Sequence, residues 1–331
     1  MRALPGVRAK RMRRLWDFNG IRDRRYNMKV CWRTVPLSWY IPFRRGVVAF
    51  KRGSFRRNIC VTILKQAQRA YRGRLAGLLT EIEPLDFPAL RFASADSMVI
   101  ETIYWFGIHG YEGLVAAAWI EQCRSATAIL EIGGNIGLFT VIGATASTAR
   151  YTVVEPVPAV AAILRDNLRL NNVAHVELLE AAMIPADHPA TVTLLVPNEQ
   201  HDMPVGAHLT VGTEVAQHAG TRQISVQGLP LRDYVAGRDL IKIDAEGVEV
   251  DLLRAVRDIL IVEKPNLLIE VLPSSPELAA FLMALAKEAS YRLIILPEWG
   301  ADRPLTVAPE DFTLAMMSQN NSKDLLLVQP K

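Results

Sequence analysis

The sequence has few cysteines, no long apolar run and almost no acidic residues near the N-terminus. These absences limit the classes of protein to which it can belong. Its three cysteines, Cys31, Cys60 and Cys123, are too few and too far apart for a disulfide framework or a four-ligand metal site. No apolar run, Leu114 to Ile120 among them, approaches the about 18 to 20 residues that cross a bilayer. The first thirty residues carry arginines where a secretory signal has an apolar segment. We therefore expect a cytoplasmic protein.

The charge of the chain is divided unevenly along its length. Residues 1–74 hold 21 lysines and arginines against only Asp17 and Asp23, a net charge of +19, whereas residues 75–331 have a net charge of −15. Tryptophan, tyrosine and phenylalanine side chains are interleaved with these arginines. This mixture is typical of segments that bind an anionic membrane surface, and nucleic acid is a less favoured partner. A solvated extension, or a mitochondrial address in a eukaryotic source, also fits the composition.

The apolar pattern predicts a domain boundary near residues 80 to 95. We divide the chain into a basic N-terminal extension over 1–90, partly helical or disordered, and a second domain over 91–331 with an insertion near 185–230. The second domain alternates strand and helix patterns, which indicates a doubly wound α/β fold with a mostly parallel seven-stranded sheet. The expected strands are Ala128 to Ile132, Tyr151 to Glu155, Val176 to Leu179, Leu240 to Asp244, Asn266 to Val271, and an antiparallel closing pair, Arg292 to Leu296 and Asp324 to Val328.

Helix patterns occupy the spaces between several of these strands. They run from Pro158 to Asn171, from Val248 to Val256 and from about Pro276 to Ala289. Strand-like pieces at Thr191 to Val196 and Gln223 to Val226 lie in the insertion, which we expect to form a lid or a substrate wall.

A glycine-rich turn follows the first expected strand of the second domain. The strand ends in Glu131, and Gly133, Gly134 and Gly137 precede a helix. The spacing does not fit the dinucleotide fingerprint, because its glycine positions after Gly133 hold Asn135 and Leu138. The next strand ends in Glu155, where a carboxylate accepts hydrogen bonds from the two hydroxyls of a ribose. Together these features predict a nucleoside ligand without a pyrophosphate.

This arrangement resembles the class I S-adenosylmethionine-dependent methyltransferases, and further segments narrow the resemblance to the FkbM type. The segments are Tyr111-Glu112, Glu131-Ile-Gly-Gly-Asn-Ile-Gly137, Val154-Glu-Pro-Val-Pro158, Asn167-Leu-Arg-Leu-Asn171, Ile241-Lys-Ile-Asp-Ala-Glu-Gly-Val-Glu249 and Pro265-Asn-Leu-Leu-Ile-Glu270. They occur in order over about residues 100 to 300. Gly134 departs from the family, which usually has alanine there. The resemblance implies methyl transfer from S-adenosylmethionine to a hydroxyl oxygen, commonly on sugars, polysaccharides or polyketides.

By this resemblance, five residues form the core of the cofactor site. Gly133, Asn135 and Gly137 would form the cofactor turn, Glu155 would hold the ribose, and Glu131 would orient the turn and the methionine amino group. Adenine is expected beside the residues after the third strand, Ala182 among them. For Glu131 and Glu155 the competing interpretation is a pair of surface carboxylates at strand ends.

The catalytic candidates follow the fourth expected strand and lie in the insertion. Asp244 is our first candidate for the base that removes the acceptor's hydroxyl proton, although a helix N-cap is an alternative role. Glu246 complements either the sulfonium charge or the helix dipole. Lys242, on the same strand, has a side chain long enough to pair with Asp244 or Glu246, and we expect its role to be purely structural. His201 is a candidate base, or else an exposed loop histidine. No residue spacing predicts a metal site.

The sequence therefore predicts an S-adenosylmethionine-dependent O-methyltransferase. We expect its acceptor to be a carbohydrate, a lipid-linked glycan or a similar small hydroxylated molecule, with residues 1–74 holding the enzyme at the inner face of a membrane. An RNA ribose 2'-O-methyltransferase is the alternative enzyme. A non-catalytic binding protein that uses the basic extension is the alternative from another class.

Overall fold

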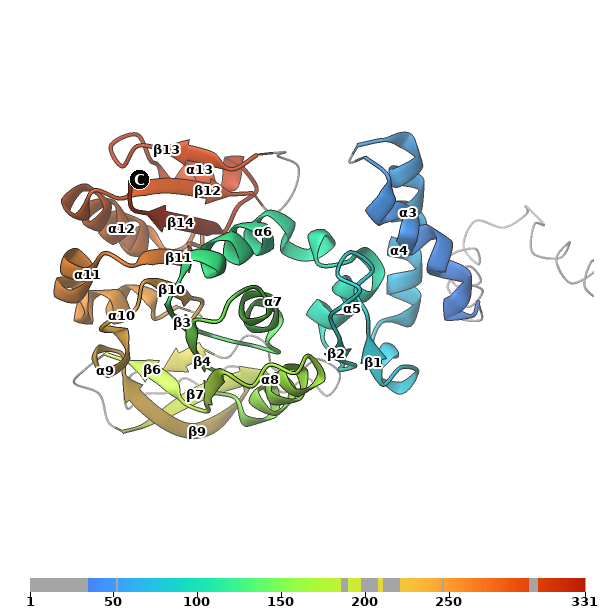
Figure 1. Ribbon diagram of the computed structural model, residues 1–331, viewed down its shortest axis with the longest axis horizontal. Helices are drawn as coiled ribbons and strands as arrows, with labels where there is room; N and C mark the ends of the chain where they lie inside the picture. The colour runs from blue at the N-terminus through green and yellow to red at the C-terminus, as the bar shows by residue number, and fades with distance from the viewer. Residues whose placement is uncertain are drawn as a thin grey trace, which may run out of the picture.

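The centre of the molecule is an eight-stranded β-sheet with helices on both faces (Figure 1). A computed structural model describes residues 35–51, 53–185, 190–197, 208–210, 221–245, 247–297 and 303–330. The strand order is β13-β12-β14-β11-β10-β3-β4-β5. The strands are β3 Ala128–Ile132, β4 Arg150–Val154, β5 Val176–Leu179, β10 Leu240–Ile243, β11 Asn266–Glu270, β12 Arg292–Leu296, β13 Leu305–Val307 and β14 Asp324–Val328.

The direction of the strands confirms the predicted fold class. The five strands from β5 to β11 run parallel, and β14 lies antiparallel between β11 and β12. The sheet has eight strands rather than the seven expected, because β13 adds an antiparallel edge to β12. Only one of the three residues of β13 is buried. The sequence therefore has no apolar run at this position from which the strand could be predicted.

Helices cover both faces of the sheet, which explains why successive residues of the central strands are apolar. In β3, Ile129 packs into the core on the side of α6, α7 and α8, whereas Leu130 and Ile132 pack into the core on the side of α10, α11 and α12. The helices are α6 His109–Ser125, α7 Leu138–Ala146, α8 Pro158–Leu170, α9 Arg232–Val235, α10 Glu249–Ala255, α11 Arg257–Glu263, α12 Pro276–Ala289 and α13 Leu314–Gln319.

The insertion forms a second, smaller sheet beside the first. Its strands are β6 Ala182–Ile184, β7 Thr191–Pro197, β8 His208–Thr210 and β9 Thr221–Pro230, in the order β6-β9-β7-β8. The long strands β7 and β9 pair antiparallel along their length. Both strand-like pieces expected in this insertion lie within β7 and β9, and a role as a lid or wall stays a prediction.

The segment before the main sheet is mostly helical. It contains α3 Ile41–Ala49, α4 Phe55–Tyr71 and α5 Met98–Phe106, with a two-stranded sheet of β1 Glu81–Ile82 and β2 Phe92–Ala93. The ring of Tyr40 packs edge-on against those of Tyr71 and Trp105 in the core. Contacts thus cross the boundary expected at residue 90, and the division into two domains stays a proposal. None of the helices among the described residues is long and apolar enough to cross a membrane.

Asn167 of α8 and Asn171, the C-cap residue directly after this helix, hold the end of the N-terminal segment. The buried Asn167 donates from Nδ2 to the carbonyl oxygen of Ile136 at 2.6 Å and accepts at Oδ1 from the backbone N–H of Ala93 at 2.6 Å. Asn171 accepts from the backbone N–H of Arg91 at 2.9 Å and donates to the carbonyl oxygen of the same residue at 2.6 Å. These two asparagine side chains therefore give β2 and the residue before it hydrogen bonds of the kind that a further strand would make.

Candidate functional site

The glycine-rich turn lies at the carboxyl end of β3, in contact with the ends of β4 and β10. The backbone N–H groups of Gly133 and Gly134 both donate to the carbonyl oxygen of Val154 at 3.0 Å. Gly133 has φ +82°, and a Cβ there would come within 1.9 Å of the carbonyl oxygen of Asp244. Gly137, with φ +87°, immediately precedes α7. A side chain at Gly133 would therefore separate the turn from the end of β10.

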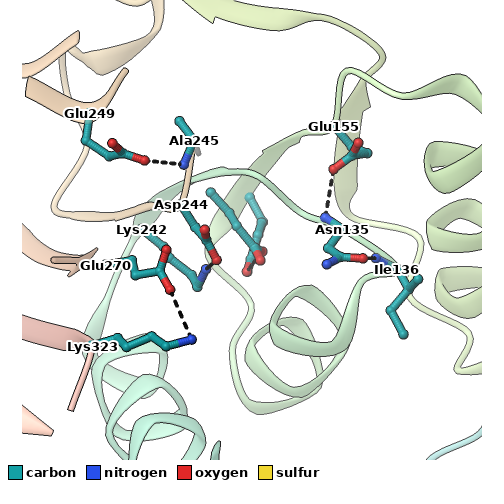
Figure 2. A network of polar contacts seen from close by, with 11 residues as sticks. Asn135, Ile136, Glu155, Lys242, Asp244, Ala245, Glu249, Glu270 and Lys323 are labelled. Carbon is teal, nitrogen blue, oxygen red and sulfur yellow. Dashed lines mark hydrogen bonds and ion pairs between the residues drawn. The ribbon is translucent and has the colours of Figure 1, made fainter. Parts of the chain in front are cut away.

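Glu155 lies directly after β4 and binds the backbone of the turn (Figure 2). Its Oε2 accepts from the N–H of Asn135 and its Oε1 from the N–H of Val157, both at 2.9 Å. The N–H of Glu155 donates to the carbonyl oxygen of Leu179 at 3.0 Å, so the end of β5 lies beside it. Burial raises the pKa of Glu155 to about 7, although the two backbone donors oppose the shift.

Glu131 is completely buried, and Glu155 is only 6% exposed. Their burial excludes the interpretation of these two residues as surface carboxylates. Its Oε2 accepts a 2.5 Å hydrogen bond from the hydroxyl of Tyr151, and its Oε1 has no hydrogen-bond partner. Burial raises the pKa of Glu131 to about 7, while the charge of Lys242 and the Tyr151 hydrogen bond oppose the shift. The Glu131 side chain therefore interacts with residues of both neighbouring strands, Tyr151 of β4 and Lys242 of β10.

Asp244 is the accessible carboxylate at this edge of the sheet. Its side chain is 39% exposed, and its Oδ2 lies 3.3 Å from Nζ of Lys242, whose side chain is 5% exposed. Of the two carboxylates that Lys242 is long enough to reach, the structure places it beside Asp244. Asp244 is not the helix N-cap, because Val248 occupies that position and Glu249 accepts hydrogen bonds from the N–H groups of Ala245 and Gly247.

Further carboxylates surround Lys242. Burial disfavours its ammonium group, but the charges of Asp244, Glu131, Asp324 and Glu112 outweigh burial and raise its pKa. The ammonium also lies 4.9 Å from the centre of the Phe139 ring. The site therefore holds one buried cation in a strongly acidic surrounding.

Asp324 contributes to this acidic surrounding from the last strand. Burial and then the charge of Glu112 raise the pKa of Asp324 well above its ordinary value, although Lys242 opposes this. In the sheet it pairs with Glu270, whose Oε1 lies 3.8 Å from Nζ of Lys323 (Figure 2). Sequence reasoning missed Asp324, because only the antiparallel register of β11 and β14 brings it next to Glu270.

The structure brings together most of the predicted site residues. Glu131, Gly133, Asn135, Gly137 and Glu155 lie at the ends of β3 and β4, with Asp244 at the end of β10. Ala182 is buried at the start of β6, where it pairs with Gly228. Its role beside adenine stays a prediction.

The other predicted site residues cannot be placed. Glu246 and His201 lie outside the described residues. In the part of the chain that the structure describes, no group of three or more His, Cys, Asp or Glu side chains is placed to hold a metal ion.

An α/β sheet with carboxylates and a glycine turn at the carboxyl ends of adjacent parallel strands is the arrangement of nucleoside-binding doubly wound enzymes. Residues 131–293 match the family model described as the Methyltransferase FkbM domain. This part of the chain is therefore a methyltransferase domain of the FkbM type. No curated protein matches the sequence.

Three similar solved structures are distant from this chain in sequence. The FkbM methyltransferase of Methylobacillus flagellatus KT is 15% identical, with a TM-score of 0.38, and the match covers 88% of this chain and 59% of that chain. A SAM-dependent methyltransferase of Agrobacterium tumefaciens is 13% identical, with a TM-score of 0.40 and coverage of 76% and 71%. The tRNA (uracil-54, C5)-methyltransferase of Pyrococcus abyssi, in complex with S-adenosyl-L-homocysteine, is 13% identical, with a TM-score of 0.39 and coverage of 75% and 44%.

Proposed function

We propose that this chain is an S-adenosylmethionine-dependent O-methyltransferase that modifies a hydroxyl group of a carbohydrate, lipid-linked glycan or similar small acceptor. The observation that carries the proposal is the position of Asp244. It is an accessible carboxylate, held by a buried lysine, directly beside the glycine turn. A base is needed at that position when a hydroxyl oxygen is the methyl acceptor.

The residues around the turn fit the cofactor. Each oxygen of Glu155 accepts one backbone N–H, and a carboxylate oxygen has a second lone pair with which to accept a hydroxyl of the ribose. The lack of a side chain at Gly133 leaves the turn in contact with the end of β10, so that the ligand and Asp244 can share one site. Gly133, Asn135, Gly137 and Glu155 would hold the cofactor, which supplies an electrophilic methyl group on a sulfonium.

The chain's own residues then have distinct tasks. Asp244 would take the proton of the acceptor hydroxyl, whose oxygen receives the methyl group that the bound cofactor would supply. The buried ammonium of Lys242 holds the Asp244 side chain in place. Placing the oxygen, carbon and sulfur in line supplies several kcal/mol of the rate enhancement, on the order of 7 or more in well-oriented systems.

The charges of the site favour a hydroxyl-rich acceptor without negative charge. Glu112, Glu270 and Asp324 gather near Asp244, and their carboxyl groups can hydrogen-bond to the hydroxyls of a sugar. The same groups repel phosphate oxygens, which weighs against RNA as the acceptor. A carbohydrate is therefore our first choice, and an RNA ribose is the alternative.

Calorimetric titration of S-adenosylmethionine into the purified protein tests the cofactor. We expect binding by the wild type, loss of binding by Glu155→Ala, and wild-type affinity for Glu177→Ala, a matched exposed glutamate on β5. A folded wild-type protein that binds no S-adenosylmethionine would contradict the proposal and would favour a non-catalytic binding protein.

Transfer of a labelled methyl group to a panel of neutral oligosaccharides, lipid-linked glycans and RNA then tests the acceptor. We expect a base-stable methyl ether on a carbohydrate hydroxyl. Label that appears only in RNA ribose would replace the first choice with the alternative, and label on nitrogen would refute O-methylation.

A further inference from the structure

The exposed apolar side chains of the described residues are concentrated in one small part of the molecule. Six of the ten large exposed apolar residues fall between positions 39 and 59. They are Trp39, Ile41, Val48, Phe50, Phe55 and Ile59. Such a concentration on an otherwise ordinary surface marks an interaction site.

Trp39 lies in a short 3-10 helix directly before α3, and the other five residues belong to a helical hairpin formed by α3 and α4. The two helices approach closely, since a Cβ on Gly46 would lie 2.7 Å from Sγ of Cys60. Nε of Arg57 on α4 donates to the carbonyl oxygen of Val47 on α3 at 3.0 Å. These contacts leave residues 48–59 as the tip of the hairpin. Figure 1 shows α3 and α4 at one end of the molecule, away from the main sheet.

The tip combines apolar and cationic side chains. Val48, Phe50, Phe55 and Ile59 are exposed there, and Phe55 is 79% exposed. The side chains of Lys51 and Arg56 are exposed between them, and Arg45 is exposed one turn before Val48 on α3. No aspartate or glutamate occurs between residues 24 and 80. The tip therefore presents apolar groups within a surface of a single, positive sign.

This charge excludes two occupants that an apolar tip would otherwise attract. Residues 1–34 carry 11 lysines and arginines against two aspartates, so their charge has the same sign as the tip. A second copy of the hairpin would bring the same positive charge. An anionic surface with an apolar interior satisfies both kinds of side chain at once.

We propose that the tip of the α3–α4 hairpin docks on the surface of an anionic phospholipid bilayer. Phe50 and Phe55 enter the boundary between headgroups and acyl chains, and Arg45, Lys51 and Arg56 contact lipid phosphates. Stable binding at a bilayer surface requires both contributions, because neither a few apolar groups nor a basic patch alone is sufficient. The enzyme is then a peripheral membrane protein whose methyl acceptor is met at the bilayer.

Co-sedimentation of the full-length protein with vesicles tests this docking. We expect binding to vesicles of phosphatidylcholine with phosphatidylglycerol, and at least about tenfold weaker binding to phosphatidylcholine alone. Each of Phe50→Ser and Phe55→Ser should weaken binding about tenfold, or about 1.4 kcal/mol. The matched control is Val262→Ser, because Val262 on α11 is also 79% exposed.

A second pair of variants separates the tip's charge from the charge of the whole chain. Arg56→Glu should weaken binding to the anionic vesicles, whereas Lys287→Glu, on α12, should not. Wild-type protein that ignores anionic vesicles, or phenylalanine variants that bind as the Val262→Ser control does, would overturn the proposal. Binding to RNA that falls in the same phenylalanine variants, without any vesicle binding, would assign the tip to nucleic acid instead.

Discussion

The carbonyl oxygen of Asp244 lies so close to Gly133 that a Cβ at position 133 would come within 1.9 Å of it. The candidate base and the cofactor turn therefore come from two different strands but are in direct contact. The N–H of Asp244 also donates to the carbonyl oxygen of Ile132, the last residue of β3, at 3.0 Å. Any shift of the turn is thus transmitted to Asp244.

Gly133→Ala is expected to destabilise the fold and abolish cofactor binding, because the new Cβ meets backbone that cannot rotate away. Gly53→Ala is the matched control, since Gly53 has a similar φ of +76° with no atom within 4 Å of a Cβ. The control carries only the cost of the left-handed backbone, about 1 kcal/mol. Urea unfolding should show Gly133→Ala to be at least about 2 kcal/mol worse than the control. Equal costs would mean that the contact with Asp244 has no energetic weight.

Lys242→Met should destabilise the protein by about 3 to 5 kcal/mol at neutral pH, because it leaves buried carboxylates without a counter-charge. At pH 5 the cost should be smaller, since Glu131 and Asp324 have raised pKa values and accept protons more readily than ordinary carboxyl groups. Urea unfolding at the two pH values measures both effects. Lys287→Met, at an exposed position on α12, is the control. A cost that is independent of pH would indicate lost packing rather than lost charge.

The raised pKa of Glu155 predicts a pH dependence of stability with a definite sign. The folded protein holds the proton up to about pH 7, whereas the unfolded chain releases it near the ordinary value of 4.5. The free energy of unfolding should therefore fall as the pH rises from about 4.5 to 7 and stay level above that, with Glu155 contributing on the order of 3 kcal/mol. Glu155→Gln should flatten this slope and Glu177→Gln should not. Parallel curves for wild type and Glu155→Gln would refute the assignment.

Asp244→Asn should lower the methyl-transfer rate at least about 100-fold while leaving cofactor affinity nearly unchanged, because the amide cannot accept the hydroxyl proton. Single-turnover kinetics with the acceptor found in the panel, beside calorimetry with S-adenosylmethionine, separates the two effects. Asp258→Asn, on the exposed surface, is the control. Unchanged transfer would move the base to another residue, with Glu246 and His201 tested next.

Elements with a strong local pattern could be predicted from the sequence. The bounds expected for α12 agree with the structure, because Pro276 marks its first turn and its apolar residues recur at helical spacing. Those of β3 agree because all its residues are buried. The grouping of the candidate site residues could also be predicted from the sequence, since the carboxyl ends of parallel strands meet at one edge of a sheet.

The parts that could not be predicted depend on contacts distant in the sequence. Leu114 to Ile120 reads only as a short apolar run, yet it lies within α6. Tyr40 appears in the sequence as one aromatic residue of a basic extension, but its side chain is fully buried against Tyr71 and Trp105. The approach of Asp324 to Lys242 requires the order of strands in the finished sheet, which local spacing does not contain.

The two hydrogen bonds of Asn167 connect the glycine-rich turn to β2, a strand far from it in the sequence. Because one side chain binds Ile136 in the turn and Ala93 in β2, the opening equilibria of these two segments are thermodynamically coupled. We expect a ligand that orders the turn to slow the hydrogen exchange of the Ala93 amide, although Ala93 precedes the residues that match the methyltransferase domain. Hydrogen exchange at Ala93 would then report whether the site is occupied, from the same N-terminal segment that contains the α3–α4 hairpin.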